Sequence, residues 1–262
     1  MRPLSARNPR VLRLAKLARR REERDEQRAL LVEGPVLLAT ALAAGADVID
    51  VYVHDDALDR PAVADVLARL DPHVVPWVVP SGTLDRVGDV ATSQGVISIV
   101  RRDQPSWPTP GTTSFVLVLA DVADPGNAGT LVRAAAAAGA GAVVVAGGVD
   151  PSNPKVVRAS AGAVFGIDVV TSPSALDALA ELSAAGYAIV GTVVRDGEFY
   201  DSVDLTGPVA VVVGNEAHGL DPALVDALEV ALTIPMAGPT ESLNVAMAGT
   251  VVCFEVLRQR RR

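Results

Sequence analysis

The chain contains few cysteines, histidines and aromatic residues, and each shortage excludes a class of protein. A single cysteine, Cys253, in 262 residues cannot form an intramolecular disulfide framework. Three scattered histidines form no cluster with metal-ligand spacing, so no metal site is predicted. Aromatic residues make up 3% of the chain and hydrophobic residues 50%, so the core is expected to consist mainly of Ala, Val and Leu.

Long apolar runs are also missing. The stretch 134–148 is too short to span a bilayer and is predicted to be a helix end followed by a buried strand. The arginine-rich N-terminus is not followed by an apolar segment, so it does not have the pattern of a secretory signal. These features predict a soluble, cytoplasmic protein with no membrane partner.

The charge is unevenly distributed along the chain. The net charge is −8, yet residues 1–28 contain ten Arg or Lys residues against four acidic ones, and 258–262 form a second basic cluster. Basic ends on an acidic body favour local contacts with phosphates. The alternative is a solvated helix face with a frayed tail, and charge alone leaves both interpretations open.

The apolar pattern divides the chain into two α/β parts. Residues 1–103 alternate helix and strand patterns behind one basic helix over 11–31, which predicts a small α/β domain. Residues 104–113 contain three prolines and no periodicity, which predicts a stiff linker. From 114 to 262, Val/Ala/Leu strands alternate with helices, which predicts a parallel sheet covered on both faces. Helices of this part are expected over 130–138, 153–163 and 242–260.

Two polar segments follow predicted strands of the second part, where ligands of parallel sheets collect. Asn127-Ala-Gly-Thr-Leu-Val-Arg133 comes after the strand 115–120. The alternative interpretation is a helix capped by Asn127 with one exposed arginine. Gly214-Asn-Glu-Ala-His-Gly219 follows the strand 209–213, and its glycines let the backbone pass close to a ligand. A glycine-rich turn with Glu216 as a local cap is the simpler alternative.

The third segment, Ser242-Leu-Asn-Val-Ala-Met-Ala-Gly249, begins the last predicted helix with small residues. Such a surface suits either close packing on the chain's own sheet or a helix–helix dimer interface, and the sequence does not separate the two. No Gly-x-Gly-x-x-Gly follows the first strand of this part and no Walker loop occurs. A dinucleotide or nucleoside triphosphate site is therefore disfavoured.

Taken together, these three segments resemble, in order and spacing, the three motifs of the SpoU (TrmH-like) RNA ribose 2′-O-methyltransferases of the SPOUT superfamily. Leu31-Val-Glu-Gly34 and Ser93-Gln-Gly-Val96 resemble the RNA substrate-binding domain that precedes the catalytic domain in many members. The resemblance implies an α/β fold with a deep trefoil knot, a homodimer packed through the knot region and the C-terminal helix, and no metal. It also implies S-adenosylmethionine as cofactor and RNA as partner.

The site residues follow from the resemblance, position by position. The cofactor would lie against Thr192, Gly214, Ile234 and Leu243, and the catalytic residues would be Asn127, Arg133, Glu216, Ser242 and Asn244. A guanidinium with a pKa above ~12 does not serve as a base, so Arg133 is expected to clamp the reacting hydroxyl and its neighbouring phosphate. Asn215 stands where relatives often carry Ser, with little expected consequence.

The predicted function is an RNA 2′-O-methyltransferase acting on ribosomal RNA. Transfer RNA is the nearest alternative substrate, and a role in antibiotic resistance stays open. A catalytically silent RNA-binding or assembly factor is the alternative from another class. The presence of all five catalytic-type residues speaks against it, because a silent protein has no need of them.

Overall fold

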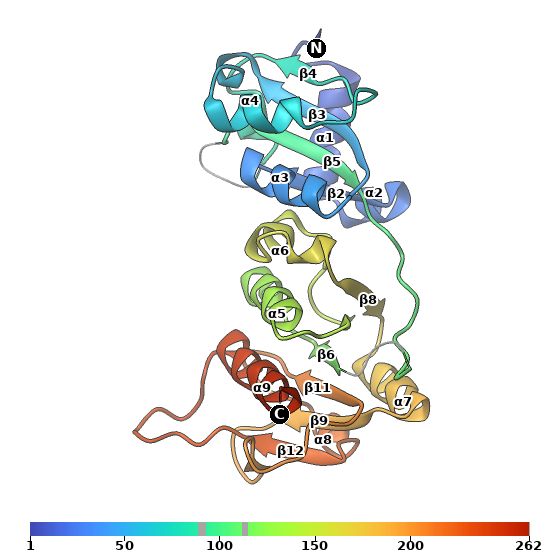
Figure 1. Ribbon diagram of the computed structural model, residues 1–262, viewed down its shortest axis with the longest axis vertical. Helices are drawn as coiled ribbons and strands as arrows, with labels where there is room; N and C mark the ends of the chain where they lie inside the picture. Colours follow the sequence, from blue (N-terminus) through green and yellow to red (C-terminus); the bar gives the residue numbers. More distant parts are fainter. Residues whose placement is uncertain (89–92, 112–114, 262) are drawn as a thin grey trace. The chain divides into compact units, whose positions relative to one another are not determined.

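The structure is a computed structural model that describes residues 1–88, 93–111 and 115–261 (Figure 1). The chain forms two compact units, Met1–Asp103 with Ser152–Phe165, and Gln104–Pro151 with Gly166–Arg262. The first unit therefore includes a segment that the sequence pattern assigned to the second domain. Residues 112–113 of the predicted linker, Ser114 at the predicted start of the second domain and Arg262 of the basic C-terminus lie outside the described residues.

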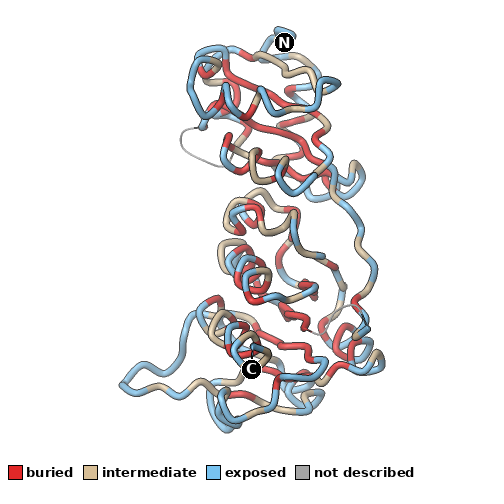
Figure 2. The backbone as a smooth tube through the Cα atoms, viewed as in Figure 1, coloured by how far each residue is buried: buried red, intermediate tan, exposed pale blue. Residues whose placement is uncertain are grey.

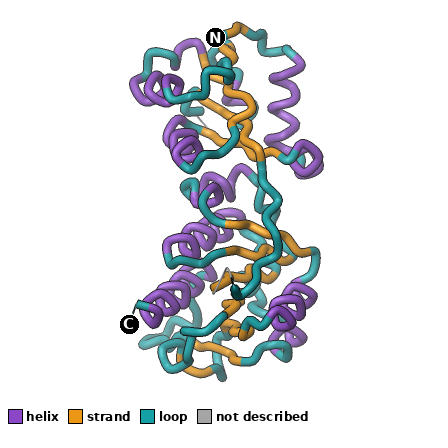
Figure 3. The backbone as a smooth tube through the Cα atoms, turned by 45° about the vertical axis from the view of Figure 1, so that its right-hand side comes forward, coloured by secondary structure: helices purple, strands orange, loops and turns teal. Residues whose placement is uncertain are grey.

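The first unit is built on a five-stranded mixed sheet in the order β1-β4-β3-β5-β2. β5 is antiparallel to β2 and β3, and the other pairs are parallel. Helices lie on both sides of the strands (Figure 3). The strands are β1 (Arg2–Pro3), β2 (Ala29–Glu33), β3 (Val48–His54), β4 (Trp77–Val79) and β5 (Val96–Arg101); the helices are α1 (Pro9–Arg19), α2 (Arg21–Gln27), α3 (Pro35–Ala43), α4 (Pro61–Ala68) and α6 (Pro154–Ala159).

The single basic helix predicted over 11–31 is wrong. The chain becomes extended at Arg20, which separates α1 from α2, and α2 ends at Gln27, followed by Arg28 with a left-handed φ of 47°. The break turns Arg24 inward, where its guanidinium donates to the Leu17 carbonyl at 2.7 Å and to Ser152 Oγ at 3.1 Å. Leu17 is in the last turn of α1, whose carbonyls have no partner within a helix, so this arginine satisfies a group that the helix leaves open.

The segment Ser152–Phe165, which belongs to the first unit although it comes much later in the chain, contains a shorter helix than predicted. α6 ends at Ala159 rather than near residue 163, because Ala161 and Gly162 have φ values of 50° and 90°. Val157 on α6 packs in the same buried cluster as Val32 and Leu38. Arg158 pairs with Glu33 at 3.4 Å. Apolar packing and an ion pair thus hold α6 to the β2 side of the first sheet.

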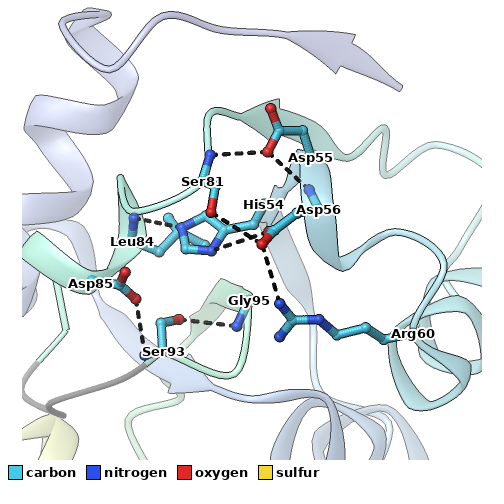
Figure 4. A network of polar contacts seen from close by, with 9 residues as sticks. All are labelled: His54, Asp55, Asp56, Arg60, Ser81, Leu84, Asp85, Ser93 and Gly95. Carbon is cyan, nitrogen blue, oxygen red and sulfur yellow. Dashed lines mark hydrogen bonds and ion pairs between the residues drawn. The ribbon is translucent and has the colours of Figure 1, made fainter.

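A polar network fixes the loops at the carboxyl end of β3 (Figure 4). The buried His54 side chain accepts a hydrogen bond from the backbone N–H of Leu84 at 2.9 Å through Nε2. Asp56 accepts from the Ser81 hydroxyl at 3.1 Å and pairs with Arg60 at 3.4 Å. Asp85 accepts from the backbone N–H of Ser93 at 3.0 Å. Three carboxylates at this end, those of Asp55, Asp56 and Asp85, are thus engaged in holding backbone and side-chain donors.

The second unit contains a seven-stranded sheet in the order β10-β12-β9-β11-β6-β7-β8, with every strand pair parallel. This confirms the predicted α/β fold with a parallel sheet. The central strands are buried (Figure 2), as expected for apolar runs covered on both faces. The strands are β6 (Phe115–Ala120), β7 (Ala142–Ala146), β8 (Asp168–Ser172), β9 (Ala188–Thr192), β10 (Glu198–Phe199), β11 (Val209–Val213) and β12 (Val230–Thr233).

Among the described residues of this unit, the helices are α5 (Pro125–Ala137), α7 (Ala175–Ala185), α8 (Pro222–Val225) and α9 (Val245–Arg260). Two of them begin elsewhere than predicted. α5 begins at Pro125 rather than Thr130, with Asp124 as its N-cap, so the interpretation of Asn127 as the cap is wrong. α9 begins at Val245 rather than Ser242, because Asn244 caps it by accepting from the backbone N–H groups of Ala246 and Met247. Among the described residues, no helix is long and apolar enough to cross a membrane.

Close packing of α9 on α5 predicts a cost for any side chain at Gly249. An added Cβ there would collide with Leu131 Cδ2 and lie 3.3 Å from Val213 Cγ1. Leu131 is fully buried. We expect Gly249→Val to lower the free energy of unfolding by about 1–3 kcal/mol, measured by urea denaturation. Gly207→Val is the matched control, since no atom lies within 4 Å of its added Cβ; equal losses in both variants would contradict the packing argument.

Candidate active site

A pocket of about 350 Å³ opens at the carboxyl ends of three adjacent strands, β9, β11 and β12. All four predicted cofactor-binding residues line it. Thr192 ends β9, Gly214 follows β11, Ile234 follows β12 and Leu243 precedes α9. The volume falls within the range of roughly 300–1,000 Å³ that is typical of small-molecule sites. Sheet order, rather than sequence distance, brings these four residues together.

The loop after β11 is a tight turn that only glycine permits at its first position. The backbone groups of Asn215 and Gly219 form two hydrogen bonds of 2.9 Å, and a Cβ on Gly214 would collide with the Gly219 carbonyl. Asn215 adds a structural contact that the sequence did not reveal, because its side-chain amide donates to the Asp121 carbonyl at 2.9 Å. Asn215 therefore ties this turn to the end of β6.

Glu216 is the acceptor at the centre of the site. Its Oε2 accepts from the backbone N–H of Ala123 at 3.0 Å, and its Oε1 accepts from that of Asp124 at 3.0 Å. Oε1 also accepts from the side-chain amide of Asn127 at 2.9 Å. The two backbone donors lie just before α5, so the carboxylate of one motif holds the helix start of another. Glu216 also lines the pocket.

Asn127 connects Glu216 to the third motif. Its Oδ1 accepts a hydrogen bond from Asn244 Nδ2 at 3.0 Å. Asn244 uses its other side-chain atom, Oδ1, to cap α9. Asn127, Glu216 and Asn244, one from each sequence motif, therefore form one hydrogen-bonded row beside the pocket.

Arg133 and Ser242 lie outside this row. Arg133 is exposed on α5, nearly two turns beyond Asn127, and within the described parts of the chain no carboxylate or carbonyl accepts from its guanidinium. Ser242 is exposed on the pocket wall, and its hydroxyl has no hydrogen-bond partner among the residues that the structure describes. These two predicted catalytic residues present free polar groups rather than contributing to the scaffold.

The structure adds pocket residues that no motif identified. Val193, Met236 and Glu241 line the cavity, and Glu241 pairs with the exposed Arg195 at 3.5 Å. Val193 comes directly after Thr192, the last residue of β9, so the end of that strand was the available signal. Ala123 and Asp124 contact Glu216 through their backbone N–H groups, which every residue except proline has. The sequence therefore could not identify these two residues as part of the site.

The hydrogen bonds to Glu216 control its ionisation. Burial is the largest single influence and acts to raise the pKa of this carboxyl. The donors from Asn127 and from the backbone of Ala123, Asp124 and Glu216 itself together outweigh it, so the pKa is lowered from its usual value. The carboxylate is therefore the form that the fold stabilises.

This lowered pKa predicts a pH-dependent contribution to stability. A carboxyl with a lowered folded pKa stabilises the fold above its unfolded pKa of about 4.3, and this contribution is lost as the pH falls through the folded value. We expect Glu216→Gln to lower the melting temperature at neutral pH, and the gap to wild type to shrink below about pH 4. Circular dichroism melts across this range measure it, with the exposed Glu181→Gln on α7 as the control. A gap that does not change with pH would contradict the assignment.

Comparison with known proteins decides the family. Residues 114–254 match the model of the SpoU rRNA Methylase family, and residues 8–98 match the MRM3-like substrate binding domain. The chain belongs to the SpoU rRNA methylase family. This confirms the resemblance carried by the three motifs, and the second match spans the segments 31–34 and 93–96 that resembled a substrate-binding domain.

Relatives of this SpoU methylase match over nearly its whole length. It is 31% identical to the 23S rRNA (guanosine(2553)-2′-O)-methyltransferase RlmP of Bacillus subtilis (strain 168), over 96% of this chain and 97% of the relative. A solved RNA 2′-O ribose methyltransferase superposes with a TM-score of 0.85 at 33% identity, covering 99% and 100% of the two chains. The AdoMet-bound rRNA methyltransferase from Sinorhizobium meliloti also gives 0.85, at 28% identity and 98% and 97% coverage.

Proposed function

We propose that this SpoU methylase transfers a methyl group from S-adenosylmethionine to a ribose 2′-hydroxyl of ribosomal RNA. The observation that carries the proposal is the convergence of Asn127, Glu216 and Asn244 from three motifs beside one pocket. The relatives named above, one of them a 23S rRNA 2′-O-methyltransferase, support the reaction and the substrate class.

The pocket suits S-adenosylmethionine in size and chemistry. Leu232, Ile234 and Val245 supply apolar wall for a purine, and the carboxylates of Glu216 and Glu241 favour a cationic ligand. Gly214 lines the pocket, and because it has no side chain the Gly219 backbone can lie close against it and shape this wall. When bound, this cofactor supplies an electrophilic methyl group on a sulfonium. Thr192, Gly214, Ile234 and Leu243 are the residues that would hold it.

The protein's own residues would orient the hydroxyl. An alcohol is a poor nucleophile, so positioning and a route for its proton are what the site must supply. The exposed guanidinium of Arg133 has free donors for the hydroxyl oxygen and an adjacent phosphate. Arg133 stays charged, so the proton would pass to that phosphate or to water. Ser242 would orient the ribose, and the row of Asn127, Glu216 and Asn244 would keep the loops in register.

We also propose a homodimer and a deep trefoil knot. The knot would form where the segment after Gly214 passes the loop around 234–238. Met247 and Phe254 support the dimer, since their seven-residue spacing places them on one side of α9 and they are 63% and 45% exposed. Leu243, just before α9, is 38% exposed. A partner subunit packed there would also explain why Arg133 is exposed and has no ion-pair partner among the residues that the structure describes. Light scattering on the purified protein measures the oligomeric state.

The reaction is tested by methyl transfer from labelled S-adenosylmethionine to unmodified ribosomal RNA and transfer RNA, with wild type beside Arg133→Ala. Label in ribosomal RNA that is lost in the variant is the expected result. Label in transfer RNA alone would show that transfer RNA, and not ribosomal RNA, is the substrate. No label and no cofactor binding by calorimetry would leave a silent RNA-binding factor as the better function.

A further inference from the structure

The proposed reaction leaves one feature of the first unit unexplained, which is the purely basic character of its first elements. Residues 1–20 contain seven Arg or Lys residues and no Asp or Glu. They form β1 and α1, and α1 buries Val11, Leu14 and Leu17 against the sheet. The positive side chains are therefore carried on an ordered surface rather than on a tail.

Two of these arginines lie over one tryptophan, and a third pairs with the carboxylate that this tryptophan contacts. The guanidinium of Arg10 lies 4.4 Å from the centre of the Trp77 ring, and that of Arg2 lies 5.6 Å from it. β1 pairs with β4 so that Arg2 stands opposite Trp77. The Trp77 indole N–H donates to Asp50 at 2.8 Å. The same carboxylate pairs with Arg10 at 3.5 Å and with Arg13 at 3.3 Å.

This cluster, which we call the Trp77 platform (Arg2, Arg10, Arg13, Asp50 and Trp77), has an excess of positive charge. Two guanidiniums, those of Arg10 and Arg13, share the Asp50 carboxylate, and a third, that of Arg2, lies over the ring. The Asp50 side chain is 11% exposed, whereas those of Arg10 and Arg13 are 46% and 35% exposed, so the carboxylate is more deeply buried than the two guanidiniums. Both pairs are longer than the roughly 2.7–2.9 Å of a good charged hydrogen bond. Arg13 also donates through Nε to Gln27 Oε1 at 2.6 Å. Each guanidinium has five N–H donors, so both keep others that a second anion can use, and their mutual repulsion favours its binding.

We propose that the Trp77 platform docks the phosphate backbone of the RNA substrate. The indole ring and Asp50 hold the guanidiniums in fixed planes, and fixed planar donors suit phosphate oxygens. The ring is occupied by arginine, so the contact would be with the backbone and independent of base sequence. This surface deepens the proposed function and rests on RNA being the substrate. It lies on the α1 side of the sheet and is distinct from the acidic loops around Asp55, Asp56 and Asp85 in Figure 4.

The test is RNA affinity as a function of salt for the full chain. The probe is a fluorescein-labelled transcript of a large-subunit ribosomal RNA fragment, titrated at several KCl concentrations. Arg2→Gln with Arg10→Gln is the test variant. Arg69→Gln with Arg101→Gln removes the same charge from two exposed, ion-paired arginines elsewhere in the unit and is the control. Cofactor binding is followed by calorimetry in every variant.

We expect the test variant to bind RNA on the order of tenfold more weakly and to lose about two units of salt slope, while the control changes neither. Arg10→Lys should keep the slope and lose affinity, because lysine keeps the charge without the planar stack. If the double variant melts early, Arg2→Gln alone should still lose about one unit of slope. An unchanged slope with intact methyl transfer would overturn the platform and leave the reaction standing. A lowered slope with no cofactor binding by wild type would instead overturn the reaction and leave the platform.

Discussion

Arg133→Ala is expected to reduce methyl transfer at least about 10²–10³-fold, as removal of a transition-state donor does in other enzymes. Folding and cofactor binding should stay intact. Arg133 is exposed on α5 and lies outside the pocket wall, so its loss leaves no cavity and no unpaired buried group. A surface change of this kind shifts the free energy of unfolding by no more than about 0.5 kcal/mol. Single-turnover methylation with a calorimetric titration of the cofactor separates the two effects.

Two further variants test the clamp: Arg133→Lys keeps the positive charge, and Arg101→Ala is the control. Lysine keeps the charge but has no planar fork, so a clamp on hydroxyl and phosphate predicts a clear loss of rate with no change in the pH profile. Arg101 is an exposed arginine paired with Asp47 at 2.7 Å and should be silent in catalysis. Near-normal turnover of Arg133→Lys with a shifted pH profile would show that the group titrates during the reaction. The clamp would then be wrong.

The parallel sheet of the second unit was predictable because its central strands are buried on both faces. β6, β7 and β11 are uninterrupted apolar runs, all Val, Ala or Leu apart from Phe115, a pattern that exposed or half-exposed segments do not show. β1 and β10 are two residues long, too short for any pattern to predict. The start of α5 was readable, since Asp124-Pro125 is an N-cap followed by proline at the first helical position.

The break between α1 and α2 depends on distant partners. Arg24 is buried because it meets Leu17 and Ser152, and Ser152 is 128 positions away. The apolar periodicity of residues 11–31 does not indicate that contact. Long-range polar partners of this kind override local helix propensity and cannot be derived from one segment.

The candidate site was also predictable only in part from the sequence. Motif resemblance identified Asn127, Glu216 and Asn244, but not that they bond in a row, because their contacts cross 89 and 117 positions of sequence. Spacing on α5 did indicate that Arg133 points away from Asn127, since six residues correspond to less than two full turns. The functional role of each residue still depends on the proposed reaction, whereas the row itself is a property of the fold.

The row of amides and carboxylate makes Asn127 the most sensitive position in the site. Its amide nitrogen donates to Glu216 at 2.9 Å and its amide oxygen accepts from Asn244 at 3.0 Å. Asn127→Asp has nearly the same shape, so packing is preserved. The substitution replaces the donor with a second carboxylate oxygen at hydrogen-bond distance from the first. Two like charges so close do not both ionise without a large cost.

We therefore expect Asn127→Asp to lose methyl transfer about 10²–10³-fold at neutral pH, because the loops after β6 and β11 are pushed apart where they frame the pocket. Part of the loss should return as the pH is lowered, since one proton shared by the two carboxylates restores a donor between them. Asn153→Asp is the matched control: Asn153 caps α6 by accepting from Lys155 N–H at 2.9 Å, and aspartate caps a helix equally well. A rate–pH profile for both variants and wild type decides the matter. If Asn127→Asp loses activity equally at every pH, the repulsion is not the cause, and the donor to Glu216 does not hold the two loops together.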